Sequence, residues 1–186
     1  MKVDHIVPYI GEEASGPTYS VPQLCQALVK YGSTVTLHVL GPVPKNDFNF
    51  TIASYSRCKL PHPRFGRSPD MKKGLIQAAI NINILHNHSL WMMPNIYPAS
   101  VLKGTRCRLV TSPRGTLSEY ALNRSPWLKK AVWVFGQGDV LRHSACLHAT
   151  AELEYREIRR KGLRAPVAII PNGIEIPPER KQKKNF

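Results

Sequence analysis

The chain has 186 residues, of which 42% are hydrophobic and 20% are charged; this apolar content suits a folded domain with its own core and argues against disorder. No segment approaches the roughly 18 uninterrupted apolar residues of a membrane-spanning helix. The 26 Lys and Arg against 12 Asp and Glu give a formal net charge of +14. Such an excess predicts a polyanionic partner, either anionic lipid headgroups, a phosphorylated substrate or nucleic acid; the alternative is a solvated basic face without a specific partner.

The N-terminal segment predicts a first strand rather than a signal peptide. Residues 1–10 carry Asp4 and His5 inside an apolar run and lack a cleavage-site pattern, so we expect a cytoplasmic protein. The four cysteines have no two-residue spacing typical of a zinc or redox motif, and we expect buried, reduced thiols. They are Cys25, Cys58, Cys107 and Cys146.

Along the chain, short strand-like runs alternate with helix-like segments. The predicted strands are 2–8, 33–40, 50–55, 84–88, 108–112, 145–150 and 167–170, of which the third has the weakest pattern. The predicted helices are about 20–31, 69–82, 94–102, 116–122, 126–142 and 150–161. This alternation predicts an α/β fold, a Rossmann-like three-layer sandwich with a mostly parallel sheet of about seven strands flanked by helices. We expect one domain over residues 1–177 and a basic tail over 178–186.

Ligands of such sheets bind at the carboxyl ends of the strands. After the first predicted strand, Gly16 and Thr18 lie in the loop before the predicted helix. A glycine there lets backbone N–H groups approach a ligand closely, and the helix N-terminus favours an anion. After the fifth strand, Arg114 would project toward the crevice and could hold phosphate or carboxylate, and Gly115 would allow a close backbone approach. The alternatives are ordinary turns and a solvent-facing arginine.

The fourth strand ends in His86-Asn87-His88, which places both histidines on one face. Two histidines could bind a metal, but no carboxylate or thiol lies nearby in sequence to complete a site, and we expect no metal. A contact from His88 to a substrate hydroxyl and a purely structural histidine are both open.

An aromatic and basic stretch runs from Trp127 to Phe135 and includes Lys129, Lys130 and Trp133. Aromatic side chains interleaved with lysine suit a membrane interface. The alternative places both tryptophans in the core and both lysines in water.

Several segments, in order, resemble motifs of family 4 glycosyltransferases. The resembling segments are 15–28, 84–91, 111–122, 149–154 and 170–175. The resemblance covers about residues 2–177 and implies the N-terminal half of a GT-B enzyme, which mainly binds the acceptor, while a C-terminal domain binds the nucleotide sugar. It also implies a hexosyl-type transfer that retains the anomeric configuration and needs no metal or other cofactor besides the nucleotide-sugar co-substrate.

The same resemblance implies a role in lipopolysaccharide or other surface polysaccharide synthesis, with a glycan or lipid-linked acceptor at the inner face of the plasma membrane. The sequence departs from the family at Ser15-Gly16, where a double glycine is usual, and at Arg114, where many relatives have a histidine. It also ends soon after Pro171-Asn172-Gly173-Ile174, so the expected donor domain is missing and transfer by this chain alone is not expected.

We expect Gly16, Thr18, His88, Arg114 and Gly115 to line the cleft. The expected partners are the acceptor, an anionic membrane surface and a separate chain that supplies the donor domain. Two further alternatives are a non-catalytic module that binds a membrane or a partner, and a truncated relic. Nucleic acid is not an expected partner, because the sequence has no zinc finger, aromatic RNA-binding motif or basic zipper.

Overall fold

The computed structural model describes residues 1–11, 16–44, 47–60 and 62–173. Within these residues, seven strands form one sheet in the order β3-β2-β1-β4-β5-β6-β7, and every neighbouring pair is parallel. The strands are β1 (Lys2–Ile6), β2 (Thr34–Leu40), β3 (Thr51–Tyr55), β4 (Ile84–His88), β5 (Arg108–Ser112), β6 (Cys146–Ala149) and β7 (Val167–Ile169). The predicted α/β fold with a seven-stranded sheet is confirmed, including its weakly patterned third strand.

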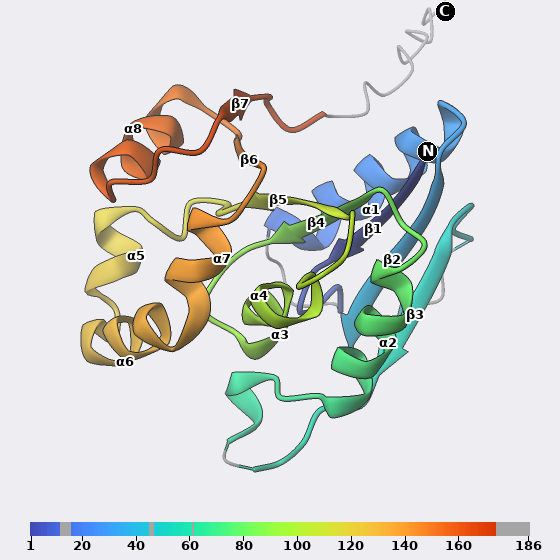
Figure 1. Ribbon diagram of the computed structural model, residues 1–186, viewed down its shortest axis with the longest axis horizontal. Coiled ribbons are helices and arrows are strands. Elements are labelled where there is room, and N and C mark those ends of the chain that lie inside the picture. The colour runs from blue at the N-terminus through green and yellow to red at the C-terminus, as the bar shows by residue number, and fades with distance from the viewer. Residues whose placement is uncertain (12–15, 45–46, 61, 174–186) are drawn as a thin grey trace, which may run out of the picture.

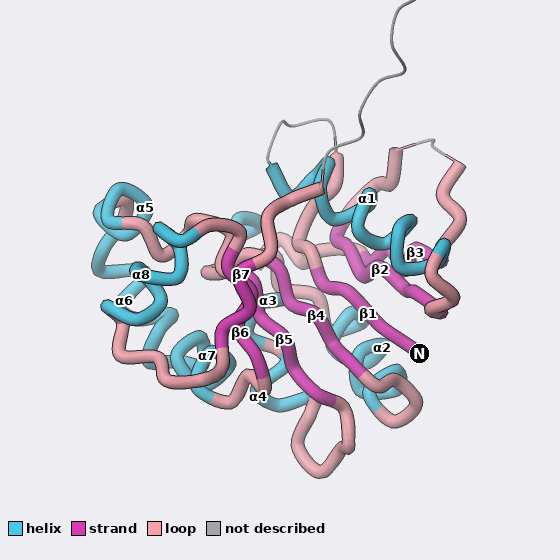
Figure 2. Tube along the Cα trace, turned by 90° about the horizontal axis from the view of Figure 1, so that it is seen from above, coloured by secondary structure: helices cyan, strands magenta, loops and turns pink. Residues whose placement is uncertain are grey.

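Helices cover both faces of the sheet and complete the three layers. They are α1 (Gly16–Lys30), α2 (Pro69–Ala79), α3 (Met93–Ile96), α4 (Pro98–Val101), α5 (Glu119–Asn123), α6 (Pro126–Val132), α7 (Gly138–Arg142) and α8 (Glu152–Arg160), with a 3-10 turn η1 (Pro63–Phe65) and a π-helical segment η2 (Trp133–Gln137). Helix α1 lies on one face, and α2, α3, α4 and α7 lie on the other (Figures 1 and 2). No helix among the described residues is both long and apolar enough to cross a bilayer.

Two helices predicted as continuous are each divided. Tyr97 ends α3 and Pro98 opens α4, because Pro98 has no amide hydrogen to donate to the carbonyl four residues earlier and is well suited to a first helical position. The segment predicted as 126–142 breaks at Gly136, which has φ 145° and ψ −20°. Helix α1 begins at Gly16, four residues earlier than predicted. The predicted tail over residues 178–186 lies outside the described residues.

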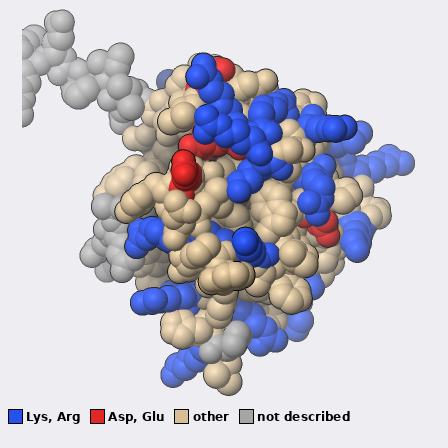
Figure 3. All heavy atoms as spheres, turned by 90° about the vertical axis from the view of Figure 1, so that its left-hand side faces the viewer, with Lys and Arg blue, Asp and Glu red and all other residues tan. Residues whose placement is uncertain are grey.

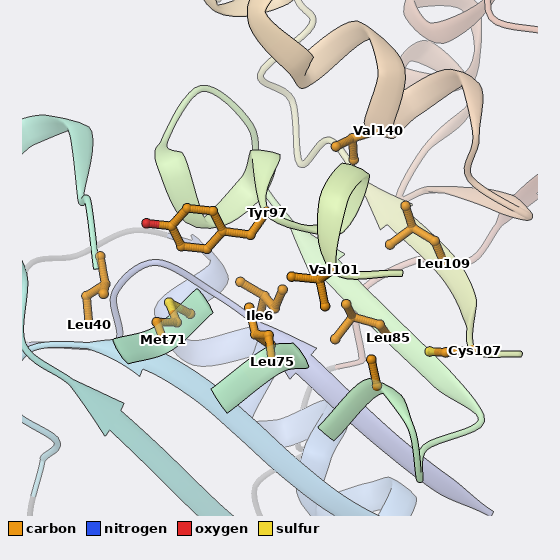
Figure 4. Close-up of a cluster of buried hydrophobic side chains, with 11 residues drawn as sticks. Ile6, Leu40, Met71, Leu75, Leu85, Tyr97, Val101, Cys107, Leu109 and Val140 are labelled. Carbon is orange, nitrogen blue, oxygen red and sulfur yellow. The ribbon is translucent and has the colours of Figure 1, made fainter. Parts of the chain in front are cut away.

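The core consists of three clusters of buried side chains. One fills the space between the sheet and helices α2 and α4, where Ile6, Leu75, Leu85 and Val101 meet (Figure 4). A second lies between α1 and strands β1 and β2, and a third lies around β6 and α8. Because each face of the sheet has its own apolar layer, the strands are held in register and their carboxyl ends share one edge.

Two of the four thiols lie in this core. Cys25 and Cys107 are buried, as predicted, whereas Cys58 and Cys146 are half-buried, and all four are free. Burial raises the pKa of Cys25 to about 12 and that of Cys107 to about 11, so both remain protonated at neutral pH.

Candidate functional site

Four histidines lie together across the sheet near its carboxyl edge. The parallel register pairs His5 of β1 with His86 of β4, and it pairs His88 with Ser112 of β5. The ring centroids of His86 and His88 are 4.0 Å apart, those of His5 and His88 are 5.3 Å apart, and those of His86 and His148 of β6 are 5.6 Å apart. The predicted common face of His86 and His88 is confirmed.

Hydrogen-bond partners assign the proton positions on one side of this array. The Ile170 carbonyl lies 2.9 Å from His148 Nε2 and can only accept, so Nε2 carries the proton. His148 Nδ1 then accepts from the Ser112 hydroxyl at 2.6 Å, and the same hydroxyl oxygen accepts from His86 Nε2 at 3.0 Å. This chain of contacts joins β4, β5 and β6 to the segment that follows β7.

A second chain of contacts begins at Arg114. A guanidinium only donates, so His88 Nδ1, 3.3 Å from Arg114, accepts. His88 Nε2 therefore carries the proton and donates to His5 Nδ1 at 3.0 Å. The remaining nitrogen, His5 Nε2, is buried and has no hydrogen-bond partner among residues 1–11, 16–44, 47–60 and 62–173. Both ring nitrogens of His88 are thus engaged and the ring is fully buried, which makes it a support for Arg114 rather than a group on the pocket surface.

The histidines of the array are neutral at physiological pH. Burial is the main cause: it lowers the pKa of His5 to about 3 and holds the pKa values of His86 and His88 well below their usual range. The pKa of His148 is also lowered, again chiefly by burial. The positive charge of Arg114 acts in the same direction on all four.

Arg114 follows β5 with φ 57°, in the left-handed region that side chains other than glycine rarely adopt. Its guanidinium donates to the Asn172 side chain as well as to His88, and Arg114 Nε is buried without a partner in the part of the chain that the structure describes. Burial lowers the pKa of Arg114, and the charge of Glu154 opposes this shift. A partly desolvated cation with no carboxylate among its hydrogen-bond partners in the described part of the chain is suited to receive an anion.

Glu154 holds the loop on which Arg114 lies. This buried carboxylate accepts from the Gly115 amide at 2.7 Å and from the Thr150 amide and hydroxyl at 2.6 and 2.9 Å. Gly115 has φ 73° and open space around its α-carbon, so the backbone angle is what requires glycine there. The Gly115 amide, proposed for a close approach to a ligand, is already bonded to Glu154.

A pocket of about 350 Å³ lies between α1 and the segment after β7. Arg114 and His148 form part of its wall, and Asn172 lies beside them. Among the described residues, the α1 side of this pocket is formed by Ser20 and residues further along the helix, but not by Gly16 or Thr18. The structure therefore brings Arg114, His88 and Gly115 together, and it places Gly16 and Thr18 at the start of α1, outside the pocket wall.

Three histidines of the array are close enough together to share a metal ion. His5, His86 and His88 each offer one nitrogen, and the three atoms lie within 4.8 Å of one another. However, His88 Nε2 carries a proton and donates a hydrogen bond to His5 Nδ1, and the Arg114 cation donates to the other nitrogen of the His88 ring. A metal ion would have to displace both interactions, so the donor set favours a hydrogen-bonded array.

Sequence reasoning missed His5, Ser112, His148 and Asn172 as members of this site. The missing information is the strand order, which places β1 and β5 on either side of β4. Once that order is known, alternation along each strand directs these side chains to the same face as His86 and His88. Asn172 lies in a turn whose position no strand pattern specifies.

An all-parallel sheet between layers of helices, with a pocket and a half-buried cation at its carboxyl edge, defines an α/β domain of the Rossmann type. A comparison with family models places the chain more narrowly: it belongs to the family of glycosyl transferase 4-like domains, whose model matches residues 15–173. The predicted family resemblance is thereby confirmed. A comparison with curated protein sequences gives no match.

Solved structures of similar fold include sucrose-phosphate synthase from Thermosynechococcus elongatus, with a TM-score of 0.62, 15% identity and coverage of 91% of this chain and 47% of that one. The apo lipopolysaccharide outer core galactosyltransferase WaaB has a TM-score of 0.60, 13% identity and coverage of 99% and 50%. Apo OtsA has a TM-score of 0.50, 14% identity and coverage of 94% and 49%. The chain thus spans about half the length of these three structures.

Proposed function

We propose that this chain is the acceptor-binding half of a retaining GT-B glycosyltransferase. Family membership, the Rossmann-type fold and the pocket at the carboxyl edge of the sheet support this assignment. The observation that carries it is Arg114, a partly buried cation in the pocket wall whose hydrogen-bond partners among the described residues are the neutral groups His88 and Asn172.

The acceptor that suits this pocket is a glycan carried on a lipid phosphate or pyrophosphate. Arg114 would pair with a phosphate oxygen, since an anion compensates the desolvation of the guanidinium. His88 would hold the guanidinium in position, and the anion would compete with the Asn172 side chain for it. The nucleotide sugar would be bound mainly by a second domain, where the leaving diphosphate must be stabilised in the transition state. No metal or other cofactor is part of this proposal.

The test joins this chain to the donor domain of a family member and measures sugar transfer to a pyrophosphate-linked acceptor. The chain alone should be inactive, and the joined protein should be active. Arg114→Gln should reduce transfer at least about tenfold, the loss of one charge-assisted contact. Arg124→Gln, an exposed arginine outside the acceptor pocket, is the matched control. Unchanged activity of Arg114→Gln would remove the role of Arg114.

Membrane attachment is the second function that a specific observation favours. Trp127, Val134 and Phe135 are 79%, 78% and 82% exposed. Lys130 Nζ lies 4.9 Å from the Trp127 ring centroid. Trp133, in contrast, is half-buried and packs near Trp91. Trp127 therefore fits the prediction of an exposed interface, and Trp133 is closer to the alternative of a core position. Lys and Arg outnumber Asp and Glu on the face that carries α5, α6 and α8 (Figure 3).

Exposed aromatic side chains beside lysines suit the interface of an anionic bilayer. We therefore propose that the protein works at the inner face of the plasma membrane, in the synthesis of surface polysaccharide. In vesicle flotation, the protein should bind anionic vesicles at low salt and neutral vesicles weakly. Trp127→Ala with Phe135→Ala should lower binding, whereas Tyr31→Ala, 86% exposed at the end of α1, should not. Equal flotation of all three proteins would contradict the proposed surface.

A further inference from the structure

A second and larger cavity, of about 940 Å³, lies between α2, α4 and α7. It reaches Arg108, the first residue of β5, whereas the acceptor pocket lies beyond Ser112, the last residue of that strand. Four strand steps separate these two residues, about 13 Å along the sheet. The cavity is therefore distinct from the proposed acceptor site, and its size is typical of a small-molecule site.

The floor of this cavity is apolar and belongs to the core. Tyr97, Leu109 and Val140 contribute to the lining and are 6%, 5% and 0% exposed. All three appear in Figure 4, where they come from the segment between α3 and α4, from β5 and from α7. Because these side chains are fixed by core packing, the floor is a preformed apolar surface.

The rim of the cavity is basic. Four exposed cations, Arg67, Lys72, Lys103 and Arg108, line it, and none of them takes part in the ion pairs found among the described residues. The one acid in the described lining is Asp139, whose carboxylate already pairs with Arg142 at 2.7 Å. The rim thus has an uncompensated positive charge directly above an apolar floor.

An exposed aromatic ring completes the entrance. Phe135 lines the cavity yet is 82% exposed, since the backbone turn at Gly136 directs it outward. The exposed surface continues from Phe135 to Val134, so the cavity opens beside the surface proposed to meet the bilayer.

From this arrangement we infer that the cavity binds a single-chain membrane lipid with an anionic phosphate head. The phosphate would lie among the four rim cations, and the hydrocarbon chain would lie against the half-buried lining residues Met93, Ile96 and Leu102, above the floor formed by Tyr97, Leu109 and Val140. Burial of the chain would be driven by the hydrophobic effect and the head would be positioned by charge. This inference does not rest on the proposed glycosyl transfer, because it concerns binding to this chain alone.

The experiment is titration calorimetry of the whole chain with lysophosphatidic acid below its micelle concentration. Saturable binding of one lipid per protein is expected. The monoacylglycerol with the same acyl chain lacks the phosphate, and inorganic phosphate lacks the chain, so both should bind at least about tenfold more weakly. Within a series of acyl lengths, affinity should rise by up to roughly fourfold per methylene until the cavity is full.

Two kinds of variant locate the binding site. Lys72→Glu with Arg108→Glu reverses two rim charges and should lower lipid affinity at least about tenfold. Lys30→Glu with Arg164→Glu makes the same change in net charge at exposed positions outside the cavity and should leave affinity unchanged. Ser100→Trp, at an exposed lining position of α4, fills the space without changing charge and should abolish binding, and its circular dichroism would verify folding.

The inference is overturned if the lipid does not bind, if the monoacylglycerol or inorganic phosphate binds as tightly, or if both charge-reversal pairs behave alike. If the cavity instead binds a polypeptide segment, the lipid would not bind.

Discussion

Burying several imidazoles side by side makes folding sensitive to pH. The pKa of His5 is about 3 in the folded protein against 6.5 for a free imidazole. Between these values the unfolded chain binds a proton that the folded chain does not. The contribution of His5 to the free energy of unfolding is therefore fully present above about pH 6.5 and is lost as the pH falls toward 3. The loss is at most about 1.4 kcal/mol per pH unit for each such histidine.

Replacement of His5 should reduce this pH dependence. Between pH 6.5 and about pH 5, the free energy of unfolding of the wild type should fall by on the order of 2 kcal/mol more than that of His5→Gln. Urea titrations at a series of pH values measure both slopes. His62→Gln, at an exposed position, should keep the wild-type slope, and equal slopes for all three proteins would show that His5 takes up its proton normally in the folded state.

A carboxylate on α8 supports the loop that carries Arg114. Glu154 is 4% exposed and accepts from Gly115 and Thr150. Glu154→Gln should cost about 2 kcal/mol, since charge-assisted bonds are lost and an amide group faces backbone donors. Urea unfolding measures this loss. Glu152→Gln, on the same helix and 3.9 Å from Arg156 Nε, should cost under about 1 kcal/mol. Similar losses for both variants would contradict the proposal that the buried Glu154 carboxylate stabilises the loop.

At the scale of elements, the break inside the predicted helix 126–142 is the main feature that pattern alone did not reveal. Apolar residues continue at helical spacing through this segment, and a single glycine is tolerated in many helices. Tertiary packing is what requires glycine at position 136, because Ile96 of α3 lies too close to the place that a β-carbon would occupy. The break directs Phe135 outward and turns Gln137 inward, where its side-chain oxygen accepts from the Trp91 amide at 3.0 Å.

Gly136→Ala should therefore destabilise the protein strongly. The added methyl group would lie 2.6 Å from Ile96 Cγ2, at a residue with φ 145°, and we expect a loss of about 3 kcal/mol in urea unfolding. Gly104→Ala has φ 75° but open space around the added carbon, so the backbone term alone should cost about 1 kcal/mol. Equal losses would mean that packing against Ile96 is unimportant.

At the scale of the whole molecule, positive charge exceeds negative charge throughout. The formal net charge is +14 with histidine counted as neutral, and the described residues include two ion pairs between arginine and a carboxylate, Arg142 with Asp139 and Arg156 with Glu152. Like charges repel more in the compact chain than in the unfolded one, and salt screens this repulsion over a distance of about 10 Å at 0.1 M.

Added salt should therefore stabilise the fold. Raising NaCl from about 0.02 M to about 0.5 M should increase Tm by about 2–4 °C, equivalent to about 1 kcal/mol for a chain of this size. Differential scanning calorimetry measures the change. Lys30→Glu with Arg164→Glu lowers the net charge and should show a smaller response. A Tm that falls with salt would indicate that attractive pairs dominate.

Much of the fold and part of the site were predictable from sequence. Strand and helix patterns have fixed periods, so the seven strands and their parallel arrangement follow from local residues such as the β-branched run at 33–40. Arg114 was predictable because it directly follows a strand. The histidine array and the cavity beside α7 were not, since they depend on which strands are neighbours and on how far short helices stand apart.

The hydrogen bond between Arg114 and Asn172 links ligand occupancy to the path of the backbone beyond the sheet. An anion bound to the guanidinium would compete with the side-chain oxygen of Asn172 and weaken one attachment of this segment. The hydrogen bonds of the Ile170 carbonyl with His148 and of the Ile170 amide with the Ala149 carbonyl would remain. Thermodynamic reciprocity then requires that any partner which fixes residues 171–173 also alters the affinity of the pocket. The segment after β7 and a bound anion therefore compete for the same Arg114 guanidinium.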